Sequence, residues 1–170
     1  EYAANIDADY YQAIRYIYKG IELAQQKRNR RQYGLMLSQL ANTYYLKRDG
    51  GGLKYALESY ELGCELNDSY LIYSGAIQSA YMYFLNKQHT QAMAYVQEAE
   101  TLMKKNNFYD QAHTFNLLGQ LLYELGNYPQ AIEYYRKAMK DKQTSQTSSV
   151  IYAYLGYARV LMKQNNYQEA

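Results

Sequence analysis

The 170-residue sequence has one proline, one cysteine, two histidines and no tryptophan. A lone cysteine excludes an internal disulfide framework and does not indicate in which cellular compartment the protein resides. The single proline and the lack of a long polar tract argue against a linker and a second domain. The sequence has no run of 18 apolar residues, so it predicts no membrane span, and it does not open with a basic segment followed by an apolar leader. A formal net charge of +2 is too small to indicate nucleic acid as a partner.

The few reactive side chains do not form a catalytic or metal-binding pattern. His89 and His113 lie 24 residues apart, and neither has a carboxylate or cysteine at ligand spacing. Cys64 follows Gly63 on a predicted helix, where a structural thiol is favoured over a nucleophile. The sequence therefore predicts a protein that is not an enzyme and that holds no metal and no cofactor.

Small residues recur with a regular period. Ala41, Ala80, Gly119 and Ala158 follow one another at intervals of 39 residues, and each is followed three residues later by an aromatic or aliphatic side chain. Residues 112–138 contain two stretches with apolar residues at helical spacing, joined by the turn Gly126–Pro129. A helix pair of this kind cannot bury its apolar faces alone, so the period predicts a solenoid of repeated hairpins.

The repeat pattern is an aromatic residue, Leu-Gly, a Gly-Asn-Tyr-x-x-Ala turn, an aromatic residue and Ala, and it resembles the tetratricopeptide repeat. The match is closest in residues 112–138, and the resemblance covers nearly the whole chain. Two departures are a period of 39 residues, against about 34 in the family, and a missing proline after each second helix. The resemblance implies an all-α, right-handed superhelical solenoid of antiparallel helix hairpins.

The expected domain organisation is a single array over residues 1–170, with about four repeats. Residues 9–13 are predicted to form a turn equivalent to residues 127–131, and residues 165–170 are predicted to open another turn. The array is therefore expected to begin and end within a repeat, as a segment of a longer protein. The basic cluster Lys27–Arg31 is interpreted as complementing the dipole at a helix C-terminus, with an anion site as the alternative.

In the family that the sequence resembles, the first helix of each hairpin lines a concave groove. The predicted groove residues share one helical face in each repeat, at spacings of three, four and seven. They are Ser38, Asn42 and Tyr45; Ser74, Ile77, Tyr81 and Phe84; His113, Asn116, Gln120 and Tyr123; and Tyr152, Leu155, Arg159, Met162 and Lys163.

The predicted groove favours an extended peptide as its ligand. Amides such as Asn42 can pair with a peptide backbone, and Arg159 and Lys163 favour an acidic residue or free carboxylate at one end. Ser38, Ile77 and Asn116 stand near the places where chaperone-tail binders of this superfamily carry cations, so chaperone C-terminal tails are not predicted as ligands.

Several interpretations stay open beside this one. The main hypothesis is a protein- or peptide-binding scaffold, with no nucleic acid and no membrane as partner. The alternative is a peptide-sensing regulatory array of a larger signalling protein, such as a transcription regulator or sensor kinase, and self-association through the array ends is a further hypothesis. The 24 tyrosines fit a recognition surface, but a compositional bias or a generic wettable surface would explain the same residues.

Overall fold

A computed structural model describes residues 2–108, 111–140 and 147–164. The described residues form α1 (Tyr2–Gln26), α2 (Arg30–Leu46), a 3₁₀ turn η1 (Gly50–Gly52), α3 (Leu53–Leu66), α4 (Ser69–Leu85), α5 (His89–Asn106), α6 (Gln111–Glu124), α7 (Tyr128–Lys140) and α8 (Thr147–Lys163). These ranges contain no strand, so the predicted all-α class is confirmed.

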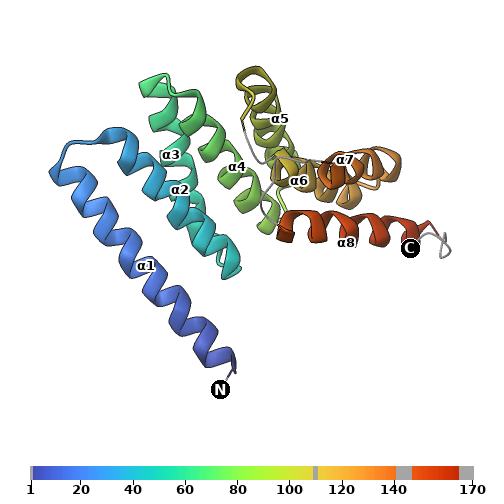
Figure 1. The fold of residues 1–170 in the computed structure, drawn as a ribbon, viewed down its shortest axis with the longest axis horizontal. Coiled ribbons are helices and arrows are strands. Elements are labelled where there is room, and N and C mark those ends of the chain that lie inside the picture. The colour runs from blue at the N-terminus through green and yellow to red at the C-terminus, as the bar shows by residue number, and fades with distance from the viewer. Residues whose placement is uncertain (1, 109–110, 141–146, 165–170) are drawn as a thin grey trace. The chain divides into compact units, whose positions relative to one another are not determined.

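The helices gather in two compact units, Glu1–Gln88 and His89–Ala170. In the first unit α1 packs on α2, α2 on α3 and α3 on α4, and α2 also contacts α4 (Figure 1). In the second unit α5 packs on α6, α6 on α7 and α7 on α8, and α6 also contacts α8. Helices that pack on the next helix and on the next but one form the predicted hairpin solenoid within each unit. The right-handed twist and the single array across both units stay predictions.

The helices are separated by short turns with a repeated backbone feature. A residue with positive φ closes α1, α2, α3 and α4 (Arg28, Arg48, Asn67 and Lys87), and Asn107 and Gly126 follow α5 and α6 in the same way. The next helix is capped where a polar side chain is present. Asp68 accepts hydrogen bonds from the backbone N–H groups of Tyr70 and Leu71 at 3.1 and 3.0 Å. Turn and cap together reverse the chain within a few residues.

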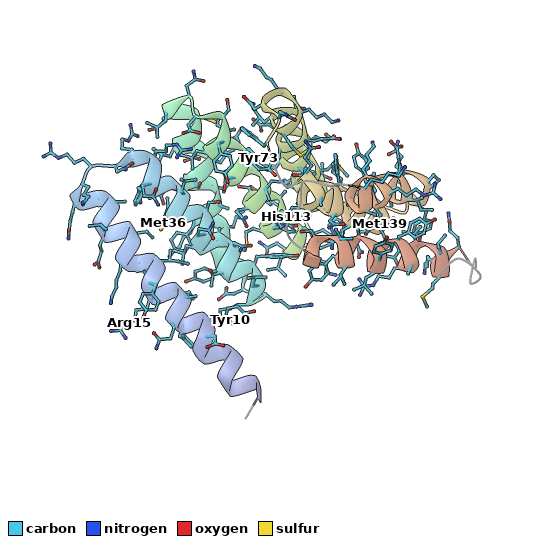
Figure 2. The ribbon with its side chains drawn as sticks, in the orientation of Figure 1. Tyr10, Arg15, Met36, Tyr73, His113 and Met139 are labelled. Atoms are coloured by element: carbon cyan, nitrogen blue, oxygen red, sulfur yellow. The ribbon has the colours of Figure 1, made fainter. Side chains whose placement is uncertain are left out.

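Glycine permits the close approach of neighbouring helices in the first unit. A Cβ atom on Gly63 of α3 would lie 2.6 Å from the backbone nitrogen of Ile72, and one on Gly75 of α4 would lie 2.5 Å from that of Tyr60. At α1 the helix contact is made through a side chain, because a Cβ on Gly20 would meet the sulfur of Met36 at 2.8 Å. Figure 2 labels Met36 on α2. The α3–α4 contact therefore brings two backbones together, whereas α1 and α2 are spaced by side chains.

The core of the second unit is built around Tyr135 of α7, which is 2% exposed. Its ring lies between two glycines, Gly119 of α6 and Gly156 of α8. Burial raises the pKa of its phenol, against the opposing positive charge of Arg159, so the hydroxyl stays neutral. The predicted role of Gly119 in a close helix contact agrees with this geometry.

The structure contradicts the predicted turn at residues 9–13. Helix α1 runs without interruption from Tyr2 through this stretch to Gln26. The stretch Asp9-Tyr10-Tyr11-Gln12 contains neither glycine nor proline, whereas the equivalent turn after α6 uses Gly126 at φ +77°. Without a residue that stops the helix, α1 continues. The predicted turn at residues 165–170 lies outside the described residues.

Candidate peptide-binding groove

The predicted groove residues of the first unit come together on α2 and α4. The hydroxyls of Ser38 and Ser74 are 2.6 Å apart, and the rings of Tyr45 and Tyr81 have centroids 4.5 Å apart. Ser38, Ile77 and Tyr81 are nonetheless buried. These side chains therefore hold α2 against α4, and only the half-exposed members of the set, Asn42, Tyr45, Ser74 and Phe84, remain accessible.

Asn116 has a comparable structural role in the second unit. Its side chain is buried, and its Nδ2 donates a hydrogen bond to the carbonyl oxygen of Ser149 at 2.6 Å. This bond joins the middle of α6 to the first turn of α8. Asn116 therefore fixes the spacing of the two helices, while His113 and Gln120 on the same face of α6 remain half-exposed.

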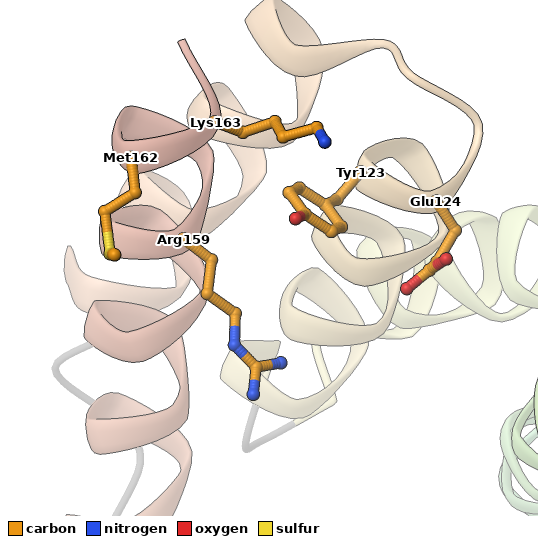
Figure 3. A pocket seen from close by; sticks show the side chains of 5 residues that line it. All are labelled: Tyr123, Glu124, Arg159, Met162 and Lys163. Atoms are coloured by element: carbon orange, nitrogen blue, oxygen red, sulfur yellow. The ribbon is translucent and has the colours of Figure 1, made fainter. Parts of the chain in front are cut away.

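The C-terminal halves of α6 and α8 form a cleft of about 460 Å³. It is lined by Tyr123 and Glu124 of α6 and by Arg159, Met162 and Lys163 of α8. Figure 3 shows Lys163 extending from α8 toward the ring of Tyr123, with Arg159 and Glu124 at the same opening. The cleft thus brings together four residues that the sequence predicted for the groove. Tyr152 is 60% exposed on α8 and does not line it.

Glu124 was missed by the sequence reasoning, although its spacing gave a signal. The predicted set on α6 followed steps of three and four and stopped at Tyr123. Glu124 lies four residues after Gln120, so it shares that face of the helix. It places one carboxylate beside two cations.

The two cations of the cleft are available to a ligand. Arg159 and Lys163 are exposed, and neither forms an ion pair with another residue that the structure describes. By contrast, Lys104 pairs with Glu100 at 2.7 Å and Lys137 pairs with Glu133 at 2.6 Å. An unpaired arginine and lysine beside an aromatic ring make a site that attracts a carboxylate.

A second cleft, of about 430 Å³, lies at the turn between α1 and α2. It is lined by Ala24, Gln25, Arg28, Asn29, Arg30 and Tyr33 and was not predicted from the sequence. The hydroxyl of Tyr33 donates a hydrogen bond to Glu58 at 2.6 Å. That bond, with burial, raises the pKa of Tyr33 to about 12.

The basic cluster Lys27–Arg31 does not lie at one helix C-terminus, as the sequence interpretation held, but is split between the end of α1 and the start of α2. Helix α1 ends at Gln26, and Arg30 and Arg31 begin α2. A helix N-terminus carries partial positive charge, so these cations need other partners. Arg30 pairs with Glu65 of α3, and Arg31 pairs with Asp68 before α4. The pairs neutralise Arg30 and Arg31, so of the two arginines that line the second cleft only Arg28 has no ion pair among the described residues, whereas the cleft between α6 and α8 has two such cations.

Searches for two other kinds of site gave negative results for the residues described. Within residues 2–108, 111–140 and 147–164, no three histidine, cysteine, aspartate or glutamate side chains come close enough to hold a metal ion. None of the helices in these same ranges has the length and apolar character that a membrane span requires.

These observations define the class first: an all-α repeat protein built from helix hairpins, with accessible side chains on the first helix of each hairpin. Residues 72–143 match the family model of the tetratricopeptide repeat. This part of the chain therefore carries tetratricopeptide repeats, which confirms the resemblance seen there in the sequence. No curated protein matches the chain. Repeats of this family are typically non-catalytic protein-interaction modules, and this supports a general role as a protein-interaction scaffold.

Proposed function

We propose that the chain binds an extended segment of a partner protein in the cleft between α6 and α8. The observation that carries the proposal is the meeting of two unpaired cations, Arg159 and Lys163, with the ring of Tyr123 in one cleft. The partner would place an acidic side chain or its free C-terminal carboxylate between the cations. A guanidinium can bind a carboxylate through two parallel hydrogen bonds, and the lysine adds a compact charge.

The other lining residues suit the rest of such a ligand. Tyr123 offers a rigid aromatic surface, and its ring is steadied by Tyr128, with centroids 5.7 Å apart. Met162 is 54% exposed and unbranched, so it adapts to differently shaped apolar side chains. Glu124 can accept hydrogen bonds from peptide N–H groups and repels a carboxylate, so it favours one orientation of the ligand.

A half-exposed amide extends this surface. Gln120 lies one turn before Glu124 on α6 and can donate to and accept from a peptide backbone. This side chain supplies a contact that depends little on peptide sequence, whereas the cleft supplies the preference for an acidic group.

Fluorescence anisotropy with a peptide library tests the proposal. The library contains peptides that end in a free carboxylate, the same peptides with an amidated C-terminus, and peptides with an internal glutamate or alanine. We expect binding of carboxylate-bearing peptides, and a loss of at least about tenfold in affinity, equivalent to 1.4 kcal/mol, for the Arg159→Glu, Lys163→Glu variant.

The matched control is Lys105→Glu, Lys140→Glu. It makes the same change in net charge on exposed residues of the same unit that do not line the cleft. Equal losses of peptide affinity in the two variants would show that overall charge causes the effect and would refute the cleft as the site. Equal binding of amidated and free peptides that lack an internal acid would refute it as well. The hypothesis of a regulatory array in a signalling protein stays a prediction from the sequence.

A further inference from the structure

Tyr135 of α7 carries a polar group that the packing of the second unit does not use. Its side chain is 2% exposed, and its ring lies between Gly119 of α6 and Gly156 of α8. The hydroxyl forms no hydrogen bond with any other residue that the structure describes. Its oxygen is not among the fully enclosed side-chain atoms without a partner, so the small exposure of Tyr135 includes the oxygen. A phenylalanine ring would fill the same space, and the packing therefore does not require the hydroxyl.

Two neighbouring tyrosines differ from Tyr135 in this respect. The hydroxyl of Tyr134 donates a hydrogen bond to Glu100 at 3.3 Å, and that of Tyr157 accepts one from Arg136 at 3.0 Å. A hydroxyl that folding has largely removed from water has already lost most of its hydration. An acceptor that reaches the Tyr135 hydroxyl therefore gains a hydrogen bond with little further cost of desolvation.

The hydroxyl lies beneath the cleft between α6 and α8. A Cβ on Gly156 would lie 2.7 Å from the hydroxyl oxygen, and Arg159 follows Gly156 by three residues. A Cβ on Gly119 would lie 2.7 Å from the ring, and Tyr123 follows Gly119 by four residues. Residues three or four apart share one face of a helix, so Arg159 and Tyr123 stand one turn beyond the ring on their two helices. Both line the cleft (Figure 3).

The charged and polar groups that act on the hydroxyl belong to the same cleft. Burial raises the pKa of Tyr135 most, the positive charge of Arg159 opposes this rise, and Tyr123 and Glu124 add to it. All three neighbours line the cleft. The hydroxyl is therefore neutral at neutral pH and keeps the proton that a hydrogen-bond donor needs.

We infer that the Tyr135 hydroxyl donates a hydrogen bond to the carboxylate that the cleft binds, and that Tyr135 is a specificity-determining residue of this site. The inference rests on the proposed function. A carboxylate can accept about four hydrogen bonds. The guanidinium of Arg159 can supply two donors and the ammonium of Lys163 a third, so the hydroxyl of Tyr135 completes the set.

This donor favours a carboxylate over the carboxamide of the same peptide. A carboxamide accepts hydrogen bonds at one oxygen only, and its own N–H donors would face the two cations of the cleft. A carboxylate presents two acceptor oxygens and no donor. The ligand class that follows is a peptide whose free C-terminal carboxylate or acidic side chain reaches the base of the cleft.

Tyr135→Phe tests the inference, because it removes the hydroxyl and leaves the ring between the two glycines. Fluorescence anisotropy compares three peptides of one sequence: one with a free C-terminal carboxylate, one amidated, and one amidated with an internal glutamate. We expect the affinity for a carboxylate peptide to fall by at least about tenfold, and that for the amidated peptide without glutamate to stay unchanged. The carboxylate peptide that shows the loss identifies the source of the bound group.

Tyr134→Phe is the matched control. It removes a hydroxyl from the adjacent residue of α7, which bonds to Glu100 and does not line the cleft, so all three peptides should bind as they do to the unmodified chain. Thermal unfolding without peptide reports the fold of Tyr135→Phe, whose midpoint should stay level or rise because no described partner is lost. An excess of carboxylate peptide should raise this midpoint less than that of the unmodified chain.

The outcomes separate this inference from the proposed function. If Tyr135→Phe binds every peptide as the unmodified chain does, while Arg159→Glu, Lys163→Glu loses the carboxylate peptides, the inference is wrong and the proposed function stands. Equal losses for amidated and carboxylate peptides would assign Tyr135 a structural role and overturn the inference as well. If the unmodified chain binds none of the peptides, the proposed function fails and the inference fails with it.

Discussion

Replacing Gly119 with alanine tests the packing around Tyr135 most directly. A Cβ at this position would lie 2.7 Å from Cε1 of the Tyr135 ring and 2.9 Å from Cδ1 and Cζ. The ring has little room to move toward α8, because it already lies against the backbone of Gly156, where an added Cβ would be 2.3 Å from Cε1 and Cζ. The added methyl group therefore has to push the α6 and α7 backbones apart or force the ring from its rotamer.

The expected cost follows from two opposing effects. Overpacking of this kind costs about 1–3 kcal/mol. Alanine in place of glycine inside a helix otherwise stabilises it by about 1 kcal/mol. We expect a net loss of up to about 2 kcal/mol, which lowers the thermal midpoint of a protein of this size by up to about 8 °C.

Thermal unfolding followed by circular dichroism measures the effect, with Gly20→Ala as the matched control. A Cβ on Gly20 would meet only the flexible side chain of Met36, its sulfur at 2.8 Å and its Cγ at 3.4 Å, so the midpoint should stay level or rise. In a Tyr135→Ala background the clash is absent, and Gly119→Ala should become neutral or stabilising. A loss of the same size in both backgrounds would refute the sandwiched ring as its cause.

Three further predictions concern single side chains. Asp68→Ala should cost about 1–2 kcal/mol by removing the α4 cap. Burial raises the pKa of Asp68, but hydrogen bonds from the backbone of Leu71 and from Arg31 outweigh this effect and lower the pKa overall. Its stabilisation is therefore present above the ordinary carboxyl pKa and is lost as the pH falls through the lowered value, so urea midpoints of wild type and variant should converge in acid. Asn116→Ala should cost about 1 kcal/mol or more by removing the buried hydrogen bond to the Ser149 carbonyl, and an unchanged urea midpoint would contradict this role. Arg159→Ala should shift the midpoint by less than about 0.5 kcal/mol, because its side chain is exposed, and a larger loss would show a structural role.

Local patterns in the sequence were sufficient for the hairpin. The spacing of apolar residues in 112–138, with a turn at Gly126, predicted α6 and α7, because helix periodicity and stop signals act over a few residues. The period also found Gly119 as the small residue of a close helix contact. The family followed from the same residues, which lie inside the matched range 72–143.

The spacing of residues along one helix could not predict which of the groove residues are accessible. Spacing placed Ser38 and Asn116 on the predicted groove face of their helices, but both are buried by a neighbouring helix. Their partners, Ser74 and Ser149, lie 36 and 33 residues away. A helical face determines direction, whereas the distance to the next helix determines whether a side chain on that face reaches a ligand or another helix.

The sequence alone thus determined the all-α class, the helix hairpins and the repeat, since these depend on interactions within one helix or one turn, and the face on which a groove lies stays a prediction. The tertiary structure decided that α1 runs through the predicted turn, that Arg30 and Arg31 are neutralised by Glu65 and Asp68, and that Glu124 joins the cleft. Burial, ion pairing and cleft lining depend on atoms brought together from distant parts of the chain, so they follow only from the packing of one helix on another.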